Sequence, residues 1–466
     1  MNKHELHPDR LATTDEHGHR IYLYPEDVKG FWKKRRDLIY FILIFIYLVL
    51  PWIQIQGKPF IKLDIFHREF TLFGLTWYGV EPILIFLSLL SFVFFIGFAT
   101  SLFGRVWCGW ACPQTVFIQS VFMRIERWIE GSARERAELD KQALTLKKLF
   151  LKSIKWVLFF LISTHIAHTF AGYFIGTHEL LNMIIQGPTA HLGTFIFISV
   201  FTLILLIDFG IFREQFCIIA CPYGRMQSVL MDENSIIVGY DQNRGEPRRG
   251  TVQKEMEGDC INCYHCVKVC PTGIDIRRGT QLECIACTLC IDACDEIMDK
   301  IKKPQGLIKY TSENELKGGS HHFITKRSLL YISISLLMFS SLVYFISQAG
   351  NLQFHIYRGT EKPYQIIKDE SGLNEIILNH LTVKVVKQGE REFQLTFKTE
   401  NHFQSQVSIT TSPHPLKIKM AETKTPLFFK FKSNILKQGH LKIKINAFHE
   451  DVLMGTFEVP LVGPME

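Results

Sequence analysis

Long apolar stretches dominate the first three quarters of the chain and set its predicted architecture. A helix needs about 20 predominantly apolar residues to cross a hydrocarbon core of about 30 Å. Five stretches with few or no charged side chains approach or reach that length, at 38–57, 82–104, 156–178, 192–212 and 329–346. The pattern therefore predicts a multi-domain, multi-pass membrane protein with five transmembrane α-helices in a lipid bilayer.

Lysine and arginine are distributed unevenly between the two ends of these stretches. Ten basic residues lie between Arg105 and Lys155, whereas residues 176–191 contain none. Because cytoplasmic loops carry the excess of Lys and Arg, we expect a membrane protein with a cytoplasmic N-terminus. The predicted parts are a cytoplasmic tail at 1–37, four helices within 38–238, a cytoplasmic segment at 239–326, a fifth helix at 327–348 and a periplasmic domain at 349–466.

Beyond residue 348 the hydrophobic period changes to two. Leu381, Val383 and Val385 alternate with polar neighbours, and the stretch Phe393–Phe397 alternates in the same way. Short alternating stretches with turn residues between them are typical of antiparallel sheets. We predict a C-terminal all-β sandwich of the immunoglobulin-like type.

Composition narrows the functional class. The 466 residues are 47% hydrophobic and 21% charged, which fits a membrane protein of several domains. The net charge of +7 comes with no basic block or recognition motif, so nucleic acid is not an expected partner. All 12 cysteines lie between Cys108 and Cys294, a distribution that disagrees with a secreted protein stabilised by disulfides.

Eight of these cysteines lie in the predicted cytoplasmic segment, in two runs with the same spacing. The runs are Cys260, Cys263, Cys266 and Cys270, followed by Pro271, and Cys284, Cys287, Cys290 and Cys294, followed by Asp295. This spacing is typical of two-cluster bacterial ferredoxins, in which the fourth cysteine of each run binds the other cluster. We therefore predict two [4Fe–4S] clusters, one bound by Cys260, Cys263, Cys266 and Cys294 and one bound by Cys284, Cys287, Cys290 and Cys270. Two zinc sites are the alternative, and the complete eight-cysteine pattern disfavours them.

The other four cysteines form a repeated Cys-x3-Cys-Pro motif. Its copies follow the second and the fourth apolar stretch, as Cys108, Cys112 and Pro113 and as Cys217, Cys221 and Pro222. Similar segments begin at Gln119 and at Gln227, which indicates an internal repeat. Each proline suits the first turn of a new helix, whose N-terminus would lower the pKa of a nearby thiol. If the copies pack together, four soft sulfur ligands meet near the cytoplasmic surface.

Three interpretations of these four cysteines compete: buried structural thiols, a redox-active disulfide, or ligands of a metal. Duplication of the motif favours a metal, and soft sulfur favours Cu(I), zinc or iron–sulfur. Because zinc is redox-inert, copper or a third iron–sulfur cluster fits better beside two electron carriers.

Titratable side chains within the apolar stretches include His165, His168 and Asp208. His165 and His168 could bind a haem, contact a quinone or form an internal hydrogen bond, but the first, second and fifth stretches offer no partner histidine for a haem. Asp208 could transfer protons or face the membrane interface.

The Cys-x3-Cys-Pro motifs, the two-cluster ferredoxin and the trailing β-sandwich together resemble the bacterial CcoG family, also called FixG or RdxA, of cytochrome c oxidase accessory proteins. The resemblance runs from about Lys33 to the C-terminus and is most specific at 108–113, 217–222 and 260–294. It implies a membrane polyferredoxin and cupric reductase that supplies Cu(I) for assembly of a haem–copper cytochrome c oxidase. The catalytic, copper-associated cysteines would then be Cys108, Cys112, Cys217 and Cys221.

The resemblance also implies partners: a cytoplasmic electron donor, and a copper chaperone or oxidase assembly factors. Membrane ferredoxins similar to NapH and NosR carry the same motifs and relay electrons from quinol, which is the alternative function. A scaffold that holds an assembly partner through its sandwich is a third possibility, and it gives the 12 cysteines no role.

Overall fold

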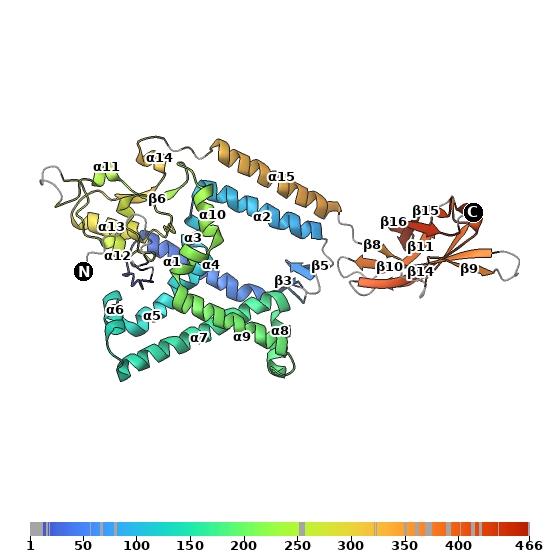
Figure 1. Ribbon diagram of the computed structural model, residues 1–466, viewed down its shortest axis with the longest axis horizontal. Coiled ribbons are helices and arrows are strands. Elements are labelled where there is room, and N and C mark those ends of the chain that lie inside the picture. Colours follow the sequence, from blue (N-terminus) through green and yellow to red (C-terminus); the bar gives the residue numbers. More distant parts are fainter. Residues whose placement is uncertain are drawn as a thin grey trace. The chain divides into compact units, whose positions relative to one another are not determined.

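The computed structural model describes residues 13, 14, 17, 19–55, 57–65, 69–78, 82–250, 257–320, 322, 324–348, 352–358, 363–368, 375–387, 393–400, 402–411, 415–418, 422–436 and 438–464. The chain forms two compact units, Met1–Trp52 with Leu89–Phe339, and Ile53–Ser88 with Ser340–Glu466. Figure 1 labels their helices and strands.

Four helices in the described residues are long and apolar enough to cross a membrane. They belong to α2 (Pro82–Phe103), α7 (Leu146–Ile175), α9 (Leu192–Ile207) with the π-helical turn η3 (Asp208–Phe212), and α15 (Lys326–Gln348). Large apolar side chains on them are exposed, such as Phe92, Leu161 and Leu203 at 60%, 55% and 55%. Apolar surface of this extent suits lipid, and the chain is a membrane protein, as predicted.

Helix α7 begins at Leu146, well before the apolar stretch predicted from residue 156. Thr145 caps its start, since its hydroxyl accepts a hydrogen bond from the N–H of Lys148 (3.2 Å). Lys152 and Lys155 in the added turns pair with Glu130 at 3.0 and 2.9 Å. Long basic side chains can extend a membrane helix beyond its apolar part because their charged ends reach polar partners.

The first predicted stretch, 38–57, forms a shorter helix. Helix α1 (Phe31–Val49) starts within the basic segment and is followed by a 3-10 turn (Leu50–Trp52) and strand β1 (Gln54–Ile55). Pro51 explains the end of the helix, because proline lacks an N–H and clashes with the preceding turn. The predicted helix end at 57 is therefore wrong, and α1 is not among the four helices above because residues 33–37 are all charged.

A carboxylate from the cysteine-rich segment caps the N-terminus of α1. Asp292 on α13 (Leu289–Lys300) accepts hydrogen bonds from the backbone N–H groups of Trp32 (3.0 Å) and Lys33 (2.7 Å). Gly30 permits this contact, since a Cβ there would lie 2.2 Å from Cγ of Asp292. The unpaired N–H groups and the dipole at a helix start both favour a carboxylate. Helix α1 is thereby attached to the cysteine-rich segment.

Short helices and turns connect the membrane helices to one another and to the cysteine-rich segment. They are α3 (Val106–Trp110), α4 (Pro113–Phe117), the π turn η2 (Ile118–Phe122), α5 (Met123–Glu130), α6 (Ala133–Lys141), α8 (Thr177–Gln186), the π turn η4 (Phe216–Ala220) and α10 (Pro222–Leu230). The cysteine-rich segment contains the paired strands β6 (Ile237–Tyr240) and β7 (Ile308–Thr311), with α11 (Gln242–Gly245), α12 (His265–Lys268), the 3-10 turn η6 (Ile276–Arg278), α13 and α14 (Glu313–Leu316). Its core includes Ile274, Ile276 and Met298, each at most 3% exposed.

The second unit is built of strands. Near its start, β1 pairs with β2 (Lys58–Pro59), and β3 (Ile61–Asp64), β4 (Glu69–Leu72) and β5 (Leu75–Tyr78) form a small antiparallel sheet. The C-terminal strands are β8 (Leu352–Tyr357), β9 (Gln365–Lys368), β10 (Glu375–Lys387), β11 (Phe393–Thr399), β12 (Val407–Thr411), β13 (Leu416–Ile418), β14 (Glu422–Phe431), β15 (His440–His449) and β16 (Val452–Val462).

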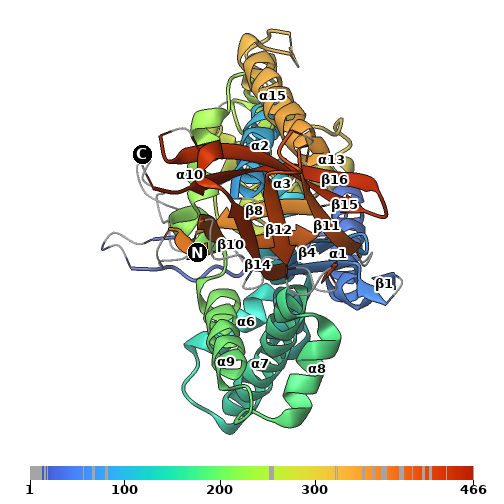
Figure 2. The same ribbon diagram turned by 90° about the vertical axis from the view of Figure 1, so that its right-hand side faces the viewer.

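These C-terminal strands form two antiparallel sheets around one core (Figure 2). One sheet has the order β12-β14-β10-β8, with β9 also paired to β10, and the other has the order β13-β11-β15-β16. Leu381, Val383 and Val385 are at most 1% exposed, as their alternation predicted. A β-rich C-terminal region is therefore confirmed, and its immunoglobulin-like type stays a prediction.

A buried cluster of charges holds the turn after η3 against α5, α6 and α7. Glu126 is 2% exposed and lies 3.0 Å from Arg136, 2.7 Å from Arg213 and 3.2 Å from Lys155. Burial raises the pKa of Glu126, but the charges of Arg213, Lys155 and Arg136 outweigh burial and lower that pKa to about 2. Removing one partner of a buried ion pair leaves an unpaired buried charge and costs about 3–5 kcal/mol.

Glu126→Gln should therefore lower the melting temperature of the purified protein. Because the pKa of folded Glu126 lies below its ordinary value of 4.5, its contribution to stability is full above about pH 5 and is lost as pH falls toward 2. The Tm difference between wild type and E126Q should stay constant from about pH 8 to pH 5 and shrink below it. Glu138→Gln is the control, since Glu138 is 57% exposed, and an equal effect of both variants would contradict this prediction.

Candidate functional site

The two Cys-x3-Cys-Pro motifs occupy equivalent turns after membrane helices. Helix α2 ends before Gly104 (φ 55°) and η3 ends before Arg213 (φ 52°), so a residue in the left-handed region follows each of them. Each of these residues lies four positions before the first cysteine of its motif, Cys108 or Cys217. The repeat in the sequence is thus also a repeat in backbone conformation.

The second cysteine of each motif lies at a helix start. Cys112 and Cys221 are the residues before α4 and α10, whose first residues are Pro113 and Pro222. Each of these cysteines donates its N–H to the carbonyl group five residues earlier, at 2.9 Å for Cys112 and 2.8 Å for Cys221. The predicted role of each proline in the first turn of a new helix is confirmed.

The first copy of the repeat is one residue longer than the second, and a π turn accommodates the extra residue. Gln119 follows Cys112 by seven positions, whereas Gln227 follows Cys221 by six. The first copy contains the π turn η2 at this place, and the second copy is an uninterrupted α-helix, α10. A π turn closes each hydrogen bond over one residue more than an α-helical turn. The insertion therefore lets both glutamines keep comparable places after their motifs.

Burial dominates the protonation of the motif thiols. It raises the pKa of Cys108, Cys112 and Cys217, and at Cys112 the N–H groups of Gln114 and Thr115 oppose this rise without reversing it. The predicted lowering of a thiol pKa at a helix start is therefore wrong for Cys112. Thiolates form in such surroundings when a bound metal displaces the proton.

The four motif cysteines lie near one another. After burial, the largest influences on the pKa of Cys217 are the charges of Cys112, Cys108 and Cys221, all of which raise it. Within the described residues, no three side chains of His, Cys, Asp or Glu are placed to share one metal ion. Binding of a single ion by the motifs therefore requires their side chains to close around it.

The other eight cysteines line two small cavities in the cysteine-rich segment. One cavity is lined by Cys260, Cys263, Cys266 and Cys294, and the other by Cys270, Cys284, Cys287 and Cys290; Cys266 lines the second cavity as well. These are the two sets that the ferredoxin spacing predicts, and sulfur donors in such sets fit [4Fe–4S] clusters. Burial raises the pKa of Cys266 and Cys284 to about 12, so a metal has to displace their protons. The assignment of each cysteine as a ligand stays a prediction.

Both cysteine runs share an unusual backbone. Asn262 and Tyr264 on either side of Cys263 have φ of 57° and 60°, and Ala286 and Thr288 beside Cys287 have φ of 52° and 66°. Left-handed conformations are costly for residues other than glycine and persist at functional sites where the surroundings impose them. The two runs therefore wrap their cavities in the same way.

The loop 284–287 packs directly on α3. Cys108 and Cys287 are buried in one apolar cluster together with Ile285. At Gly109, a Cβ would lie 2.5 Å from the carbonyl oxygen of Ile285, closer than real contacts allow. The first Cys-x3-Cys-Pro motif and the second cysteine cavity therefore share a buried boundary.

Hydrogen bonds from three elements fix this boundary. The hydroxyl of Tyr40 on α1 donates to the carbonyl of Gly109 (2.5 Å). The indole N–H of Trp110 donates to the hydroxyl of Tyr310 on β7 (2.8 Å), which in turn donates to the carbonyl of Ala286 (3.1 Å). Helix α1, helix α3 and strand β7 thus hold the loop together.

Two arginines beside these sulfur groups have no role that the cysteine motifs predict. Arg36 is 1% exposed and donates to the carbonyl of Cys287. Arg105 is 8% exposed and donates to Oε1 of Gln227 (2.9 Å), which also accepts from Sγ of Cys108 (3.3 Å). By composition both are only basic residues near a membrane boundary. Position in the sequence could have indicated a role, because Arg105 lies three residues before Cys108 and Gln227 is the first residue of the repeated segment.

The polar residues of the membrane helices do not line the cysteine cavities. Nδ1 of His168 lies 2.7 Å from the carbonyl oxygen of Thr164, one of the arrangements expected for it. His168 and His191 line a cavity of about 430 Å³ among α7, α8 and α9, and His165 does not. Oδ1 of Asp208 is buried and has no partner within the described residues.

Comparison with known proteins supports iron–sulfur chemistry. A family described as a 4Fe-4S dicluster domain matches residues 212–313, and one described as a 4Fe-4S binding domain matches residues 84–130. The second match covers Cys108 and Cys112. With the apolar helices, these matches define a membrane iron–sulfur electron-transfer protein with two 4Fe-4S domains.

Three curated relatives identify the family. RdxB of Cereibacter sphaeroides is 35% identical over 433 residues, which cover 88% of this chain and 87% of RdxB. RdxA of the same organism is 41% identical over 62% of each chain, and FixG of Rhizobium meliloti is 35% identical over 63% of this chain and 57% of FixG. The matches thus span less than two thirds of RdxA and FixG. This chain belongs to the FixG/CcoG family, which includes RdxA, RdxB and FixG.

Replacing Cys294 with Ala should damage the cluster that Cys260, Cys263 and Cys266 are predicted to bind, although Cys294 belongs to the other run. About four of the eight irons expected for two clusters should be lost. Iron and sulfide analysis with EPR would measure this loss. Cys270→Ala is the matched variant and should damage the other cluster; damage by each variant to the cluster of its own run would contradict the crossed assignment.

Gly109→Ala should separate loop 284–287 from α3, because the added Cβ collides with backbone rather than with a movable side chain. We expect a lower Tm and a changed EPR signal of the cluster held by this loop. Gly97→Ala on α2 is the control, since nothing lies within 4 Å of a Cβ built there. Equal behaviour of the two variants would show that the close approach has no consequence.

Proposed function

We propose that this protein reduces Cu(II) to Cu(I) at its Cys-x3-Cys-Pro cysteines, and that the product serves the assembly of a haem–copper cytochrome c oxidase. The observation that carries the proposal is the buried boundary shared by Cys108 and Cys287. It brings a site for a substrate metal next to a site for an electron carrier. Each reduction consumes one electron from a low-potential cytoplasmic donor, which is oxidised as Cu(II) becomes Cu(I).

The donor atoms support copper as the substrate. Cys108, Cys112, Cys217 and Cys221 offer sulfur, and soft sulfur ligands favour Cu(I). Their burial also favours the ion of lower charge, because charge away from water costs free energy. Both effects make bound copper easier to reduce.

The two cysteine cavities would hold [4Fe–4S] clusters, which carry single electrons when bound. Cys260, Cys263, Cys266 and Cys294 would bind one, and Cys284, Cys287, Cys290 and Cys270 would bind the other. The chain itself buries Cys260, Cys266 and Cys287 and fixes loop 284–287 on α3. Residues Gly109 and Tyr310 supply the close contact and the hydrogen bond that do so.

The membrane topology is part of the proposal. We infer that α1 is a fifth membrane helix, since Leu38, Phe41 and Phe45 on it are 60%, 68% and 56% exposed. By the distribution of Lys and Arg, the N-terminus and the cysteine-rich segment face the cytoplasm of a bacterium, and the immunoglobulin-like sandwich faces the periplasm. A copper chaperone or oxidase assembly factors are the partners that this function requires.

A second candidate function is an electron relay from quinol, as in membrane ferredoxins similar to NapH and NosR. The cavity of about 430 Å³ among α7, α8 and α9 favours it. Apolar side chains, including Phe160 and Leu180, line this cavity together with His168 and His191. Apolar cavities with a few polar groups are typical sites for small ligands.

The test separates the two functions with paired variants. Cys108→Ser with Cys112→Ser, and Cys217→Ser with Cys221→Ser, should each lower copper reduction at least about tenfold, because a shared site loses half of its ligands. The protein is first reduced and freed of reductant, then mixed with Cu(II) and a chelator specific for Cu(I). Iron content near eight per protein is the internal control that both clusters remain.

Two outcomes would contradict copper reduction at these cysteines. If both double variants reduce copper like the wild type but lose quinol oxidation, the protein is a quinol-linked relay. If each variant instead loses about four irons, the motifs hold a third iron–sulfur cluster. Copper would then have to bind elsewhere.

A further inference from the structure

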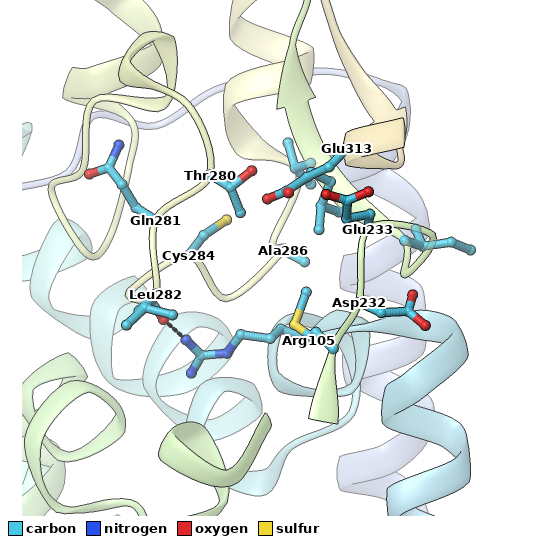
Figure 3. A pocket seen from close by; sticks show the side chains of 13 residues that line it. Arg105, Asp232, Glu233, Thr280, Gln281, Leu282, Cys284, Ala286 and Glu313 are labelled. Carbon is cyan, nitrogen blue, oxygen red and sulfur yellow. Dashed lines mark hydrogen bonds between the residues drawn. The ribbon is translucent and has the colours of Figure 1, made fainter. Parts of the chain in front are cut away.

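Arg105 is a buried cation that contacts three separate parts of the fold. It is 8% exposed, directly precedes α3 and lines a cavity of about 300 Å³ (Figure 3). Its Nε donates to Oε1 of Gln227 on α10 (2.9 Å), and its Nη1 donates to the carbonyl oxygen of Leu282, two residues before Cys284. One guanidinium therefore links the first motif, the helix after the second motif and the loop of the second cysteine run.

Gly224 on α10 makes room for this guanidinium. A Cβ at Gly224 would lie 3.0 Å from Nη2 of Arg105 and 2.9 Å from the carbonyl oxygen of Cys217. Glycine inside a helix is less favourable than alanine. Because Gly224 has no side chain, the second repeat can approach Arg105, and this contact offsets the cost.

Gln227 connects the guanidinium to sulfur. It is 0% exposed, and its Oε1 accepts hydrogen bonds from both Arg105 and Cys108. Nε2 of the same amide is buried without a partner within the described residues, a rare state for a buried donor.

No carboxylate in the described part of the chain pairs with Arg105. Asp232, Glu233 and Glu313 line the same cavity but lie across it from the guanidinium (Figure 3). When the two repeats are aligned so that Arg213 matches Gly104, Glu214 takes the position of Arg105. The second repeat therefore has no cation at this position. A buried charge requires an opposite charge nearby, and anionic sulfur ligands on either side of Arg105 would provide it.

We propose that Arg105 is a positioning residue that joins the Cys-x3-Cys-Pro site to the cluster site of Cys270, Cys284, Cys287 and Cys290, and that its charge stabilises the anionic sulfur ligands of both. The copper part of this inference rests on the proposed function; the cluster part does not. A fixed positive charge favours the reduced cluster, which carries one more negative charge, and so raises its reduction potential. The same charge strengthens copper binding by thiolates, and partners of metal ligands typically contribute about 10–100-fold in affinity.

The test compares Arg105→Gln, Arg105→Lys and the control Arg134→Gln, whose arginine is 88% exposed, in the full-length purified protein. Redox titration followed by EPR measures both cluster potentials, and competition with a chelator measures Cu(I) affinity. R105Q should lower the potential of one cluster, leave that of the other unchanged and weaken Cu(I) binding about 10–100-fold. R105K keeps the charge but loses the planar fork. It should keep the potential near that of wild type while slowing reoxidation of the cluster by Cu(II).

Potentials and copper affinity of R105Q equal to those of R134Q would overturn the proposal. Loss of a cluster in both R105Q and R105K would overturn it as well, because the role of Arg105 would then be structural alone. If the wild type fails to reduce copper while R105Q still lowers one cluster potential, the proposed function fails and the placement of Arg105 beside the cluster is supported.

Discussion

The close approach of α3 to loop 284–287 is the constraint on which the rest of the site depends. Gly109 has no side chain, and the backbone of Ile285 and Ala286 occupies the space that a Cβ would need. This approach buries Cys108 and Cys287 in one apolar cluster. Two sulfur sites that are far apart in the sequence thereby become neighbours without a covalent link. The helix cap and the hydrogen bonds from aromatic side chains around the two sites hold α3 against loop 284–287.

Burial and charge act in opposite directions around the sulfur groups. Burial raises the pKa of Cys108, Cys112 and Cys217 and so favours their protonated thiols. A metal reverses this state, because its ligands must lose their protons. Arg36, Arg105 and Arg277 are buried cations close to cysteines that would become anionic. The buried cations around the cysteines would therefore stabilise the metal-bound state more than the metal-free state.

What the sequence could predict was carried by short-range patterns. Apolar length located four of the membrane helices, period-two alternation located the core strands, and cysteine spacing identified the two sets that line the cavities. The early end of α1 has a local cause in Pro51, whereas other features depend on long-range contacts. The cap of α1 comes from Asp292, 260 residues away from Trp32. The helix start at Cys112 can be read from Pro113, but its burial, which decides the direction of the pKa shift, cannot.

If the predicted clusters form, the cap on α1 makes the folding of this helix depend on iron. Asp292 stands between Cys290 and Cys294 on α13, and it receives the first N–H groups of α1. Metal sites of this kind organise their backbone only when the metal is bound. An iron-starved chain would therefore present an uncapped first helix to the membrane. A shortage of iron would then cause a folding defect near the N-terminus, independently of electron transfer.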